Sequence, residues 1–309
     1  MDIFIQQLAN GLIIGSIYAL IALGYTMVYG ILGLINFAHG DVVMVGAMTT
    51  ISLFGLLLGL LTGLPAGVVL VLAVVIAMPL CAALGFGIER IAYRPLRHAP
   101  RLAPLITAIG VSIVLQNLAM LIWGRGYKSF PDVLSVEPFV FLGAHITMYQ
   151  AVTFFLSLIL MVGLWFLVQQ TRLGRAMRAT AQNEKVAALM GVNVNRVISQ
   201  VFMIGSALGC IAGVMYTASY GQAQASMGFL LGLKAFSAAV LGGIGNIRGA
   251  VLGGFLLGLI EAFGAGYLAD LTGGFMGSEY KDVFAFLVLI AVLMVRPSGL
   301  LGEKESERA

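Results

Sequence analysis

The stretch Leu34–Gly46, LINFAHGDVVMVG, places a short group of polar and flexible residues between two long apolar segments. These residues are Asn36, His39, Gly40 and Asp41, and they are called the polar break below. Apart from Asp41, the chain carries no charged residue between its second position and position 89. A carboxylate and an imidazole are costly in lipid unless they face protein or water. The polar break is therefore either a hinge embedded in the membrane or a short turn at its surface.

The composition excludes an ordinary soluble domain. Hydrophobic residues make up 60% of the chain and charged residues 10%, whereas soluble domains carry about 25% charged residues. The mean hydropathy is +1.02. Because no segment is long and polar enough to form a soluble core, residues 1–309 are predicted to form one all-α, polytopic membrane domain. The formal charge of +4 lies in loops beside apolar segments, where contact with membrane lipid is expected, and we predict no nucleic-acid partner.

Apolar segments of about 20 residues, the length of a spanning helix, recur along the chain. The predicted spans lie roughly at 8–30, 42–62, 66–88, 102–123, 148–169, 197–218, 229–245, 249–268 and 282–300. Turn-like sequences separate the second from the third and the seventh from the eighth. We therefore expect about eight to ten transmembrane helices, broken or re-entrant segments included.

Basic residues predict the orientation of these spans. The loops 89–101 and 171–196 are rich in Lys and Arg, and such loops usually face the cytoplasm. An even number of predicted spans separates the two loops, so the assignment is consistent. The connection 124–147 is then external and the C-terminal tail is cytoplasmic. The N-terminus is external if all nine spans cross fully.

Glycine residues suggest an internal repeat. The chain has 40 glycines, and they cluster around the polar break and again around 242–258. In each cluster an asparagine precedes a glycine between apolar segments: Asn36 precedes Gly40, and Asn246 precedes Gly249. Paired glycine-interrupted segments are typical of transporters built from inverted repeats, in which they meet beside the substrate. Close helix packing through glycine is the alternative interpretation.

Charged residues within the predicted spans are candidates for function. Glu261 lies inside the eighth span, and Lys234 lies in the seventh. Because buried charges are usually paired, we expect Lys234 to be the partner of Glu261, and a structural ion pair is the alternative to a transport role. His39 has no second histidine at a metal-ligand spacing, so we predict a hydrogen-bonded turn residue and no metal site. No catalytic motif or cluster is evident, which predicts a protein that is not an enzyme.

The loop 171–196 is the most informative polar segment. Arginines recur at every third residue from Arg172 to Arg178, and Ala179–Met190 is rich in helix formers. Gly191 is suited to ending that helix. The predicted helix either rests on anionic lipid headgroups or docks on a cytoplasmic partner. Its apolar residues exceed what a solvated loop requires, which favours docking.

These residues carry a resemblance to a known family. Val186–Gly191, VAALMG, looks like the EAA-type loop of ABC importer permeases, in which a cytoplasmic helix inserts into a groove on the ATPase. Together with other long motifs, the chain resembles the LivH-type permeases of branched-chain amino acid ABC importers, and the resemblance covers nearly the whole chain. The other motifs are GYTMVYGILGLINFAHG at 24–40, ERIAYRP at 89–95, AIGVSIVLQN at 108–117, AVLGGIGNIRG at 239–249 and PSGLLG at 297–302.

The resemblance implies the ABC importer permease fold, a bacterial inner membrane location and a set of partners. These are a second, homologous permease of the LivM type, two cytoplasmic ATP-binding subunits and a periplasmic amino-acid-binding protein. The chain has no phosphate-binding loop of the G-x-x-x-x-G-K-[ST] type, so it is expected to bind no cofactor and to rely on ATP hydrolysis by its partners. The alternative is an ion-coupled secondary amino acid transporter that acts alone, with Asp41 or Glu261 as the coupling residue.

Two sets of candidate residues follow. The expected translocation path and hinge residues are Asn36, His39, Gly40, Asp41, Asn246, Gly249 and Glu261. The expected ATPase-coupling residues, within the coupling loop 171–196, are Arg175, Glu184, Ala187, Ala188 and Gly191.

Overall fold

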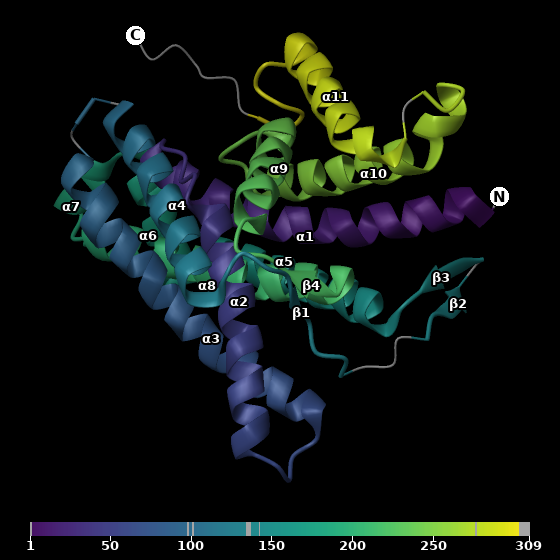
Figure 1. The fold of residues 1–309 in the computed structure, drawn as a ribbon. Helices are drawn as coiled ribbons and strands as arrows, with labels where there is room; N and C mark the ends of the chain where they lie inside the picture. Colours follow the sequence, from purple (N-terminus) through teal and green to yellow (C-terminus); the bar gives the residue numbers. More distant parts are fainter. Residues whose placement is uncertain are drawn as a thin grey trace.

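The computed structural model describes residues 2–97, 99–100, 102–133, 137–141, 143–275 and 277–302, and these residues are predominantly helical (Figure 1). The α-helices are α1 (Asp2–Leu32), α2 (His39–Leu60), α3 (Ala66–Ile88), α4 (Leu102–Trp123), α5 (Met148–Gln170), α6 (Arg172–Gln182), α7 (Glu184–Leu189), α8 (Val194–Tyr220), α9 (Met227–Gly242), α10 (Ile247–Leu271) and α11 (Lys281–Val295). A π-helix, η1 (Glu89–Tyr93), and a 3₁₀ turn, η2 (Arg94–Leu96), continue α3, and a second 3₁₀ turn, η3 (Ser278–Tyr280), precedes α11.

Four short strands complete the described secondary structure. They are β1 (Lys128–Ser129), β2 (Phe139–Phe141), β3 (Ala144–Ile146) and β4 (Gln222–Ala223). β1 pairs with β4, and β2 forms a hairpin with β3, both antiparallel. The hairpin lies beside the N-terminal end of α1 (Figure 1), where Gln6 Oε1 accepts a hydrogen bond of 2.7 Å from the His145 backbone amide.

Each of the nine predicted spans coincides with a helix, which confirms an all-α polytopic membrane protein. Among the described residues, seven helices are long and apolar enough to cross a membrane. The seventh and ninth predicted spans, α9 and α11, have 16 and 15 residues and are shorter than the roughly 20 residues of a full crossing. Helix α1 is longer than predicted, with 31 residues and a length of about 46 Å.

Helix α1 lies at the centre of the molecule. Of its most apolar 18-residue window, 89% is buried inside the protein, against 22% for α3 and for α4. It packs most extensively against α10 and also against α8 and α9. The outer faces of α3, α4 and α5 expose many large apolar side chains, as expected of helices that contact lipid or another membrane subunit.

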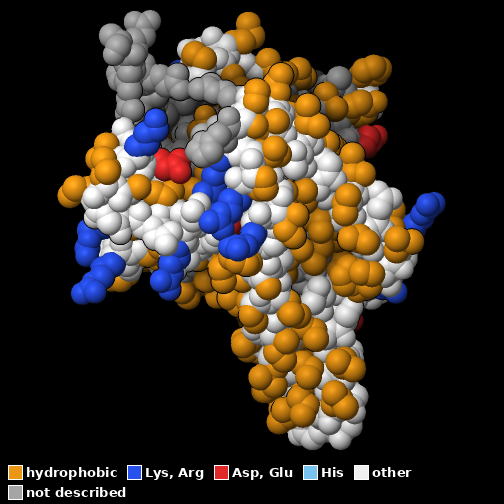
Figure 2. Space-filling model, turned by 90° about the vertical axis from the view of Figure 1, so that its left-hand side faces the viewer, with side chains coloured by type: hydrophobic (Ala, Val, Ile, Leu, Met, Phe, Trp, Pro, Cys, Tyr) orange, Lys and Arg blue, Asp and Glu red, His pale blue; other side chains and the backbone are white. Residues whose placement is uncertain are grey.

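Basic side chains gather on the side of the molecule that carries α6 and α7 (Figure 2). This side, called the basic face below, is formed by the end of α3 with η1 and η2, by α6 and α7, and by the start of α8. The hairpin of α2 and α3 projects below it and is largely covered by hydrophobic side chains (Figure 2). The basic side chains are therefore concentrated on one face, whereas the projecting α2–α3 hairpin is largely apolar (Figure 2).

Candidate functional site

The polar break is buried inside the protein. Helix α1 ends at Leu32, and α2 begins at His39, so His39, Gly40 and Asp41 lie in the first turn of α2 and not in a turn between helices as predicted for His39. Asn36, His39 and Asp41 are 4%, 2% and 0% exposed. Because α1 is long enough to cross the membrane completely, the break needs no re-entrant segment. Its burial shows that these side chains face protein, and the choice between a hinge embedded in the membrane and a turn at its surface stays a prediction.

His39 fills a space between α1 and α8. Its ring lies edge-on to Tyr25 of α1, with centroids 4.9 Å apart and an interplanar angle of 74°. Gly24 of α1 provides the room: a Cβ built there would lie 2.6 Å from His39 Cε1. Gly209 of α8 also borders the ring, since a Cβ built there would lie 3.5 Å from His39 Cε1. In this arrangement His39 contributes to helix packing and does not line an open channel.

Asp41 is a buried carboxylate without a hydrogen-bond donor. Neither of its oxygens has a hydrogen-bond partner among the described residues. Ser112 and Gln116 of α4 face the carboxylate, but they do not reach hydrogen-bond geometry, and the Gln116 amide instead donates to Ser112 Oγ at 3.1 Å. The position of Asp41 in the first turn of α2 is electrostatically favourable, since the helix N-terminus carries a partial positive charge.

The second predicted break lies between α9 and α10, and Asn246 caps the helix that follows it. Its Oδ1 accepts hydrogen bonds from the backbone amides of Arg248 and Gly249 at 3.0 and 3.3 Å. The C-terminal end of α1 lies beside the loop that precedes Asn246, because a Cβ added to Gly30 would lie 3.6 Å from the Gly245 carbonyl oxygen. The inverted repeat stays a prediction.

Glu261 belongs to a cluster of buried charges that joins α1, α9, α10 and α11. The predicted pairing is present: Lys234 Nζ lies 2.9 Å from Glu261 Oε1. The same ammonium group lies 2.7 Å from Asp282 Oδ1, and Lys281 Nζ lies 3.4 Å from Glu261 Oε1. Tyr18 donates a hydrogen bond of 2.7 Å to Glu261 Oε2. The five residues are called the charge cluster below.

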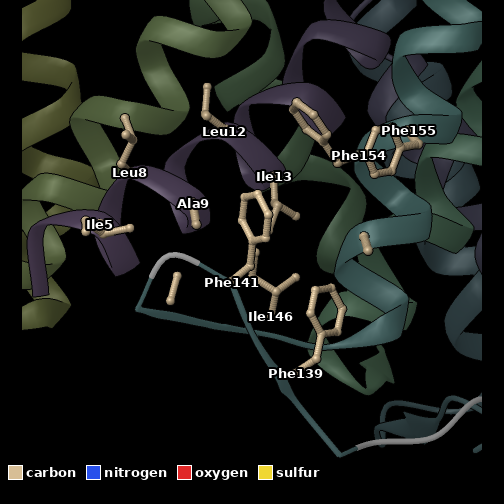
Figure 3. Close-up of a pocket in the computed structure, with 12 residues that line it drawn as sticks. Ile5, Leu8, Ala9, Leu12, Ile13, Phe139, Phe141, Ile146, Phe154 and Phe155 are labelled. Carbon is tan, nitrogen blue, oxygen red and sulfur yellow. The ribbon is translucent and has the colours of Figure 1, made fainter. Parts of the chain in front are cut away.

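Two cavities flank α1 on the side away from the basic face. An apolar cavity of about 390 Å³ lies between α1, α5 and the β2–β3 hairpin. In Figure 3, Ile13, Phe154 and Phe141 approach one another across it. A smaller cavity of about 220 Å³ borders the charge cluster and is lined in part by Asn10 and Gln150. The apolar cavity offers no side-chain group that would bind the charged ends of an amino acid, whereas the smaller one does.

The coupling loop 171–196 forms two helices, so the prediction of a single one was wrong. Asn183 interrupts the run of helix formers, because its Oδ1 accepts a hydrogen bond of 3.1 Å from the Val186 amide and caps a new helix. Asn193 caps α8 in the same way, through the Arg196 amide at 3.1 Å. Asparagine is among the preferred capping residues, and this is the signal that marks both boundaries in the sequence.

A groove of about 740 Å³ opens between α7 and the start of α8. Glu184 and Ala188 line it, whereas Ala187 is buried beneath it and Arg175 is exposed on α6. Leu189 and Met190 beside it are 86% and 80% exposed. The structure therefore places two of the predicted coupling residues, Glu184 and Ala188, in the lining of one groove, whose only charged lining residues among those described are Glu184 and Lys185. Because this groove opens on the basic face, it is called the basic groove below.

Gly191 ends α7 as predicted. Its φ of +85° lies in the left-handed region, which favours glycine. The Val192 amide donates to the Ala187 carbonyl at 3.0 Å, and the Gly191 amide donates to the Ala188 carbonyl at 3.0 Å. These two bonds are the pattern of a Schellman motif, so the shape of the groove edge depends on this glycine.

Glu89 was not among the predicted site residues, although it is 0% exposed. It forms an ion pair with Arg97 and accepts a hydrogen bond of 2.6 Å from Ser199 Oγ of α8. Arg97 also donates to Asn195 Oδ1 at 2.6 Å. The sequence signal was a lone acidic residue at the end of a long uncharged segment. Glu89 was missed because it falls in the predicted loop 89–101, and residues in a basic loop are expected to be solvated.

Long apolar helices, two interrupted helix pairs and a basic groove at one end define a multi-pass membrane protein of the permease class. Comparison with known proteins agrees. The family model for the branched-chain amino acid transport system permease component matches residues 7–293, and the chain belongs to this family.

Individual relatives match over nearly their whole length. The chain is 47% identical to the high-affinity branched-chain amino acid transport system permease protein BraD of Pseudomonas aeruginosa, over 99% of this chain and 98% of the relative. It is 44% identical to the corresponding protein LivH of Escherichia coli, over 99% and 97%. A probable branched-chain amino acid transport permease protein LivH of Methanocaldococcus jannaschii is 28% identical over 96% and 91%.

Proposed function

We propose that the chain is the transmembrane permease subunit of an ABC importer that carries leucine, isoleucine or valine across the bacterial inner membrane. The observation that carries the proposal is the similarity to permeases of high-affinity branched-chain amino acid systems over nearly the full length of both chains. The chain itself binds no cofactor and catalyses no reaction. Its partners are a LivM-like permease, two ATP-binding subunits and a periplasmic amino-acid-binding protein.

The basic face lies in the cytoplasm in this proposal, since Lys and Arg concentrate on cytoplasmic loops. The C-terminal tail then lies on the same side as α6 and α7. The ATPase docks at the basic groove, where the exposed Leu189 and Met190 supply an apolar anchor and the surrounding arginines supply charge. Docking would remove these two exposed apolar side chains from water, which is favourable in proportion to the apolar area buried.

In this proposal the two helix breaks act mainly as hinges, and lining the path is their lesser role. Asn36, His39, Gly40 and Asp41 on one side, and Asn246 and Gly249 on the other, lie where helix pairs change direction and where glycines allow close backbone approach. Movement of one pair relative to the other opens the path alternately to each side. Glu261 is held by three partners, which supports a role in holding the helices that border the path.

The test is uptake by the purified complex in proteoliposomes. ATP inside the vesicles and the amino-acid-binding protein outside should drive accumulation of radiolabelled leucine, and a complex without the ATPase should not transport. Transport by the chain alone, driven by a proton or sodium gradient without ATP, would instead establish the ion-coupled secondary transporter.

The coupling surface yields a specific prediction. Replacing Gly191 by arginine forces a residue with a side chain into a left-handed conformation, which costs about 1–2 kcal/mol, and adds bulk at the groove edge. We expect ATPase binding to weaken by about tenfold, the factor that corresponds to 1.4 kcal/mol, with a matching loss of uptake. Co-purification of the ATPase and leucine uptake measure the effect.

Gly191→Asn is the matched control for this change, because asparagine tolerates the left-handed region. It should retain most of the docking. Equal ATPase binding by the wild-type and Gly191→Arg chains would show that the ATPase binds elsewhere.

A further inference from the structure

Glu89 and its partners fasten the end of α3 to the start of α8. The carboxylate is completely buried, and its two oxygens are held from two sides, by Arg97 of the following loop and by Ser199 of α8 at 2.6 Å. The guanidinium of Arg97, 6% exposed, also reaches Asn195. Breaking a buried ion pair by removing one partner leaves an uncompensated charge, so these two segments are held together strongly.

The same segment reaches the polar break. Tyr93, at the other end of η1, is 1% exposed, and its hydroxyl donates a hydrogen bond of 3.1 Å to Asn36 Oδ1. Its ring also packs against Phe202 of α8, with centroids 5.2 Å apart. Residues 89–97 therefore touch α8 on one side and the linker between α1 and α2 on the other.

The helix type of η1 suits a segment that changes conformation. Residues Glu89–Tyr93 form a π-helix, which is rare and occurs frequently at functional sites. Its Arg94 amide donates to the Glu89 carbonyl, and the chain then passes directly into the 3₁₀ turn η2. A segment that changes helix type twice within eight residues can change its winding without unfolding α3.

The start of α8 connects this segment to the basic groove. Asn195, the partner of Arg97, lines that groove together with Glu184 and Ala188. The contacts thus run without interruption from the groove, through Asn195 and Arg97 to Glu89, and along η1 from Glu89 to Tyr93 and Asn36.

We infer that Glu89, Tyr93 and Arg97 are positioning residues that transmit movement of the α7–α8 corner to the polar break. A partner that shifts this corner carries Arg97 and Glu89 with it. Rewinding of η1 then moves Tyr93, which alters the angle between α1 and α2 at Asn36. This inference rests on the proposed function, because the movement has a purpose only if an ATPase docks at the basic groove.

The test compares leucine transported per ATP hydrolysed in the reconstituted complex. Tyr93→Phe removes one hydroxyl, and Arg97→Lys keeps the charge but shortens the reach to Asn195. Each should lower the ratio by about fivefold, the factor expected when about 1 kcal/mol of coupling is lost, while ATP hydrolysis continues. Tyr127→Phe, on an exposed tyrosine, and Arg90→Lys, on the exposed face of η1, are matched controls and should leave the ratio unchanged.

The outcomes separate the inference from the proposed function. A wild-type complex that fails to transport with ATP overturns the proposed function. A transporting wild type whose Tyr93→Phe and Arg97→Lys variants keep the normal ratio overturns the inference, even if less complex assembles, because a purely structural role changes yield and not the ratio.

If the variants do not assemble, a measurement on the wild-type complex tests the inference. Hydrogen–deuterium exchange with and without ATP should change together in peptides covering 183–195, 89–97 and 33–38. A change confined to 183–195 overturns the inference.

Discussion

Replacing Glu261 by leucine is expected to destabilise the protein by about 3–5 kcal/mol, the usual cost of removing one partner from a buried ion pair. Glu261 is 2% exposed and is the shared acceptor of Lys234 and Lys281. Its loss also leaves the Tyr18 hydroxyl without its acceptor. Because the charge cluster joins four helices, we expect a large decrease in thermal unfolding temperature and in the monodisperse fraction in detergent.

Asp282→Asn is the matched control within the cluster. Asp282 shares Lys234 with Glu261 but is 27% exposed, so solvent compensates for much of the loss and the expected effect is below about 1 kcal/mol. Glu261→Gln should lie between the two, since it keeps the acceptor for Tyr18. A Glu261→Leu chain with an unfolding temperature equal to that of the wild type would show that the cluster contributes nothing to stability.

The pairing within this cluster was predictable in part. Two opposite charges in adjacent apolar segments have few alternatives in a membrane, and this identified Lys234 as the partner of Glu261. Asp282 and Lys281 were missed, because both lie at the predicted start of the last span, where solvation is the ordinary expectation. Helix α10 packs against α11, and this tertiary contact cannot be predicted from the spacing of residues in the sequence.

Local signals predicted the helices better than their contacts. Apolar length placed a helix at each of the nine predicted spans, seven of them long and apolar enough to cross a membrane among the described residues, and Gly191 marked the end of α7. The boundary at Asn183 was also visible, as an asparagine followed by a helix former, but the run of helix formers concealed it. The hydrogen bond from Tyr93 to Asn36 joins residues 57 positions apart, and nothing in either segment indicates the other.

The polar break shows a different limit. Its composition indicated function, yet the same residues meet the needs of close packing: His39 occupies space left by Gly24, and Gly40 faces glycines of α9. A sequence shows that a position is small but does not show which backbone passes beside it. Small residues at these positions allow the backbones to approach closely, so the same glycines that suggested a hinge also account for the packing.

Replacing Gly40 by valine is expected to prevent α2 and α9 from packing, with loss of both folded protein and uptake. A Cβ at this position would lie 2.6 Å from Gly232 Cα, and the obstacle is backbone, which no side-chain rotation relieves. Overpacking of a tight core usually costs about 1–3 kcal/mol, and contact between two backbones places this change at the upper end. Monodisperse yield, unfolding temperature and reconstituted leucine uptake measure the result.

Gly55→Val is the matched control, because Gly55 lies on the same helix and a Cβ there meets nothing within 4 Å. It should retain normal folding and uptake, so the effect at Gly40 cannot be attributed to helix propensity. Gly232→Val, which introduces bulk from the α9 side of the same contact, should reproduce the defect, since a Cβ there would lie 2.9 Å from Gly40 Cα. Normal uptake by Gly40→Val would mean that α2 and α9 are separated in the working transporter, and the close contact between them would then belong to one stage of the transport cycle.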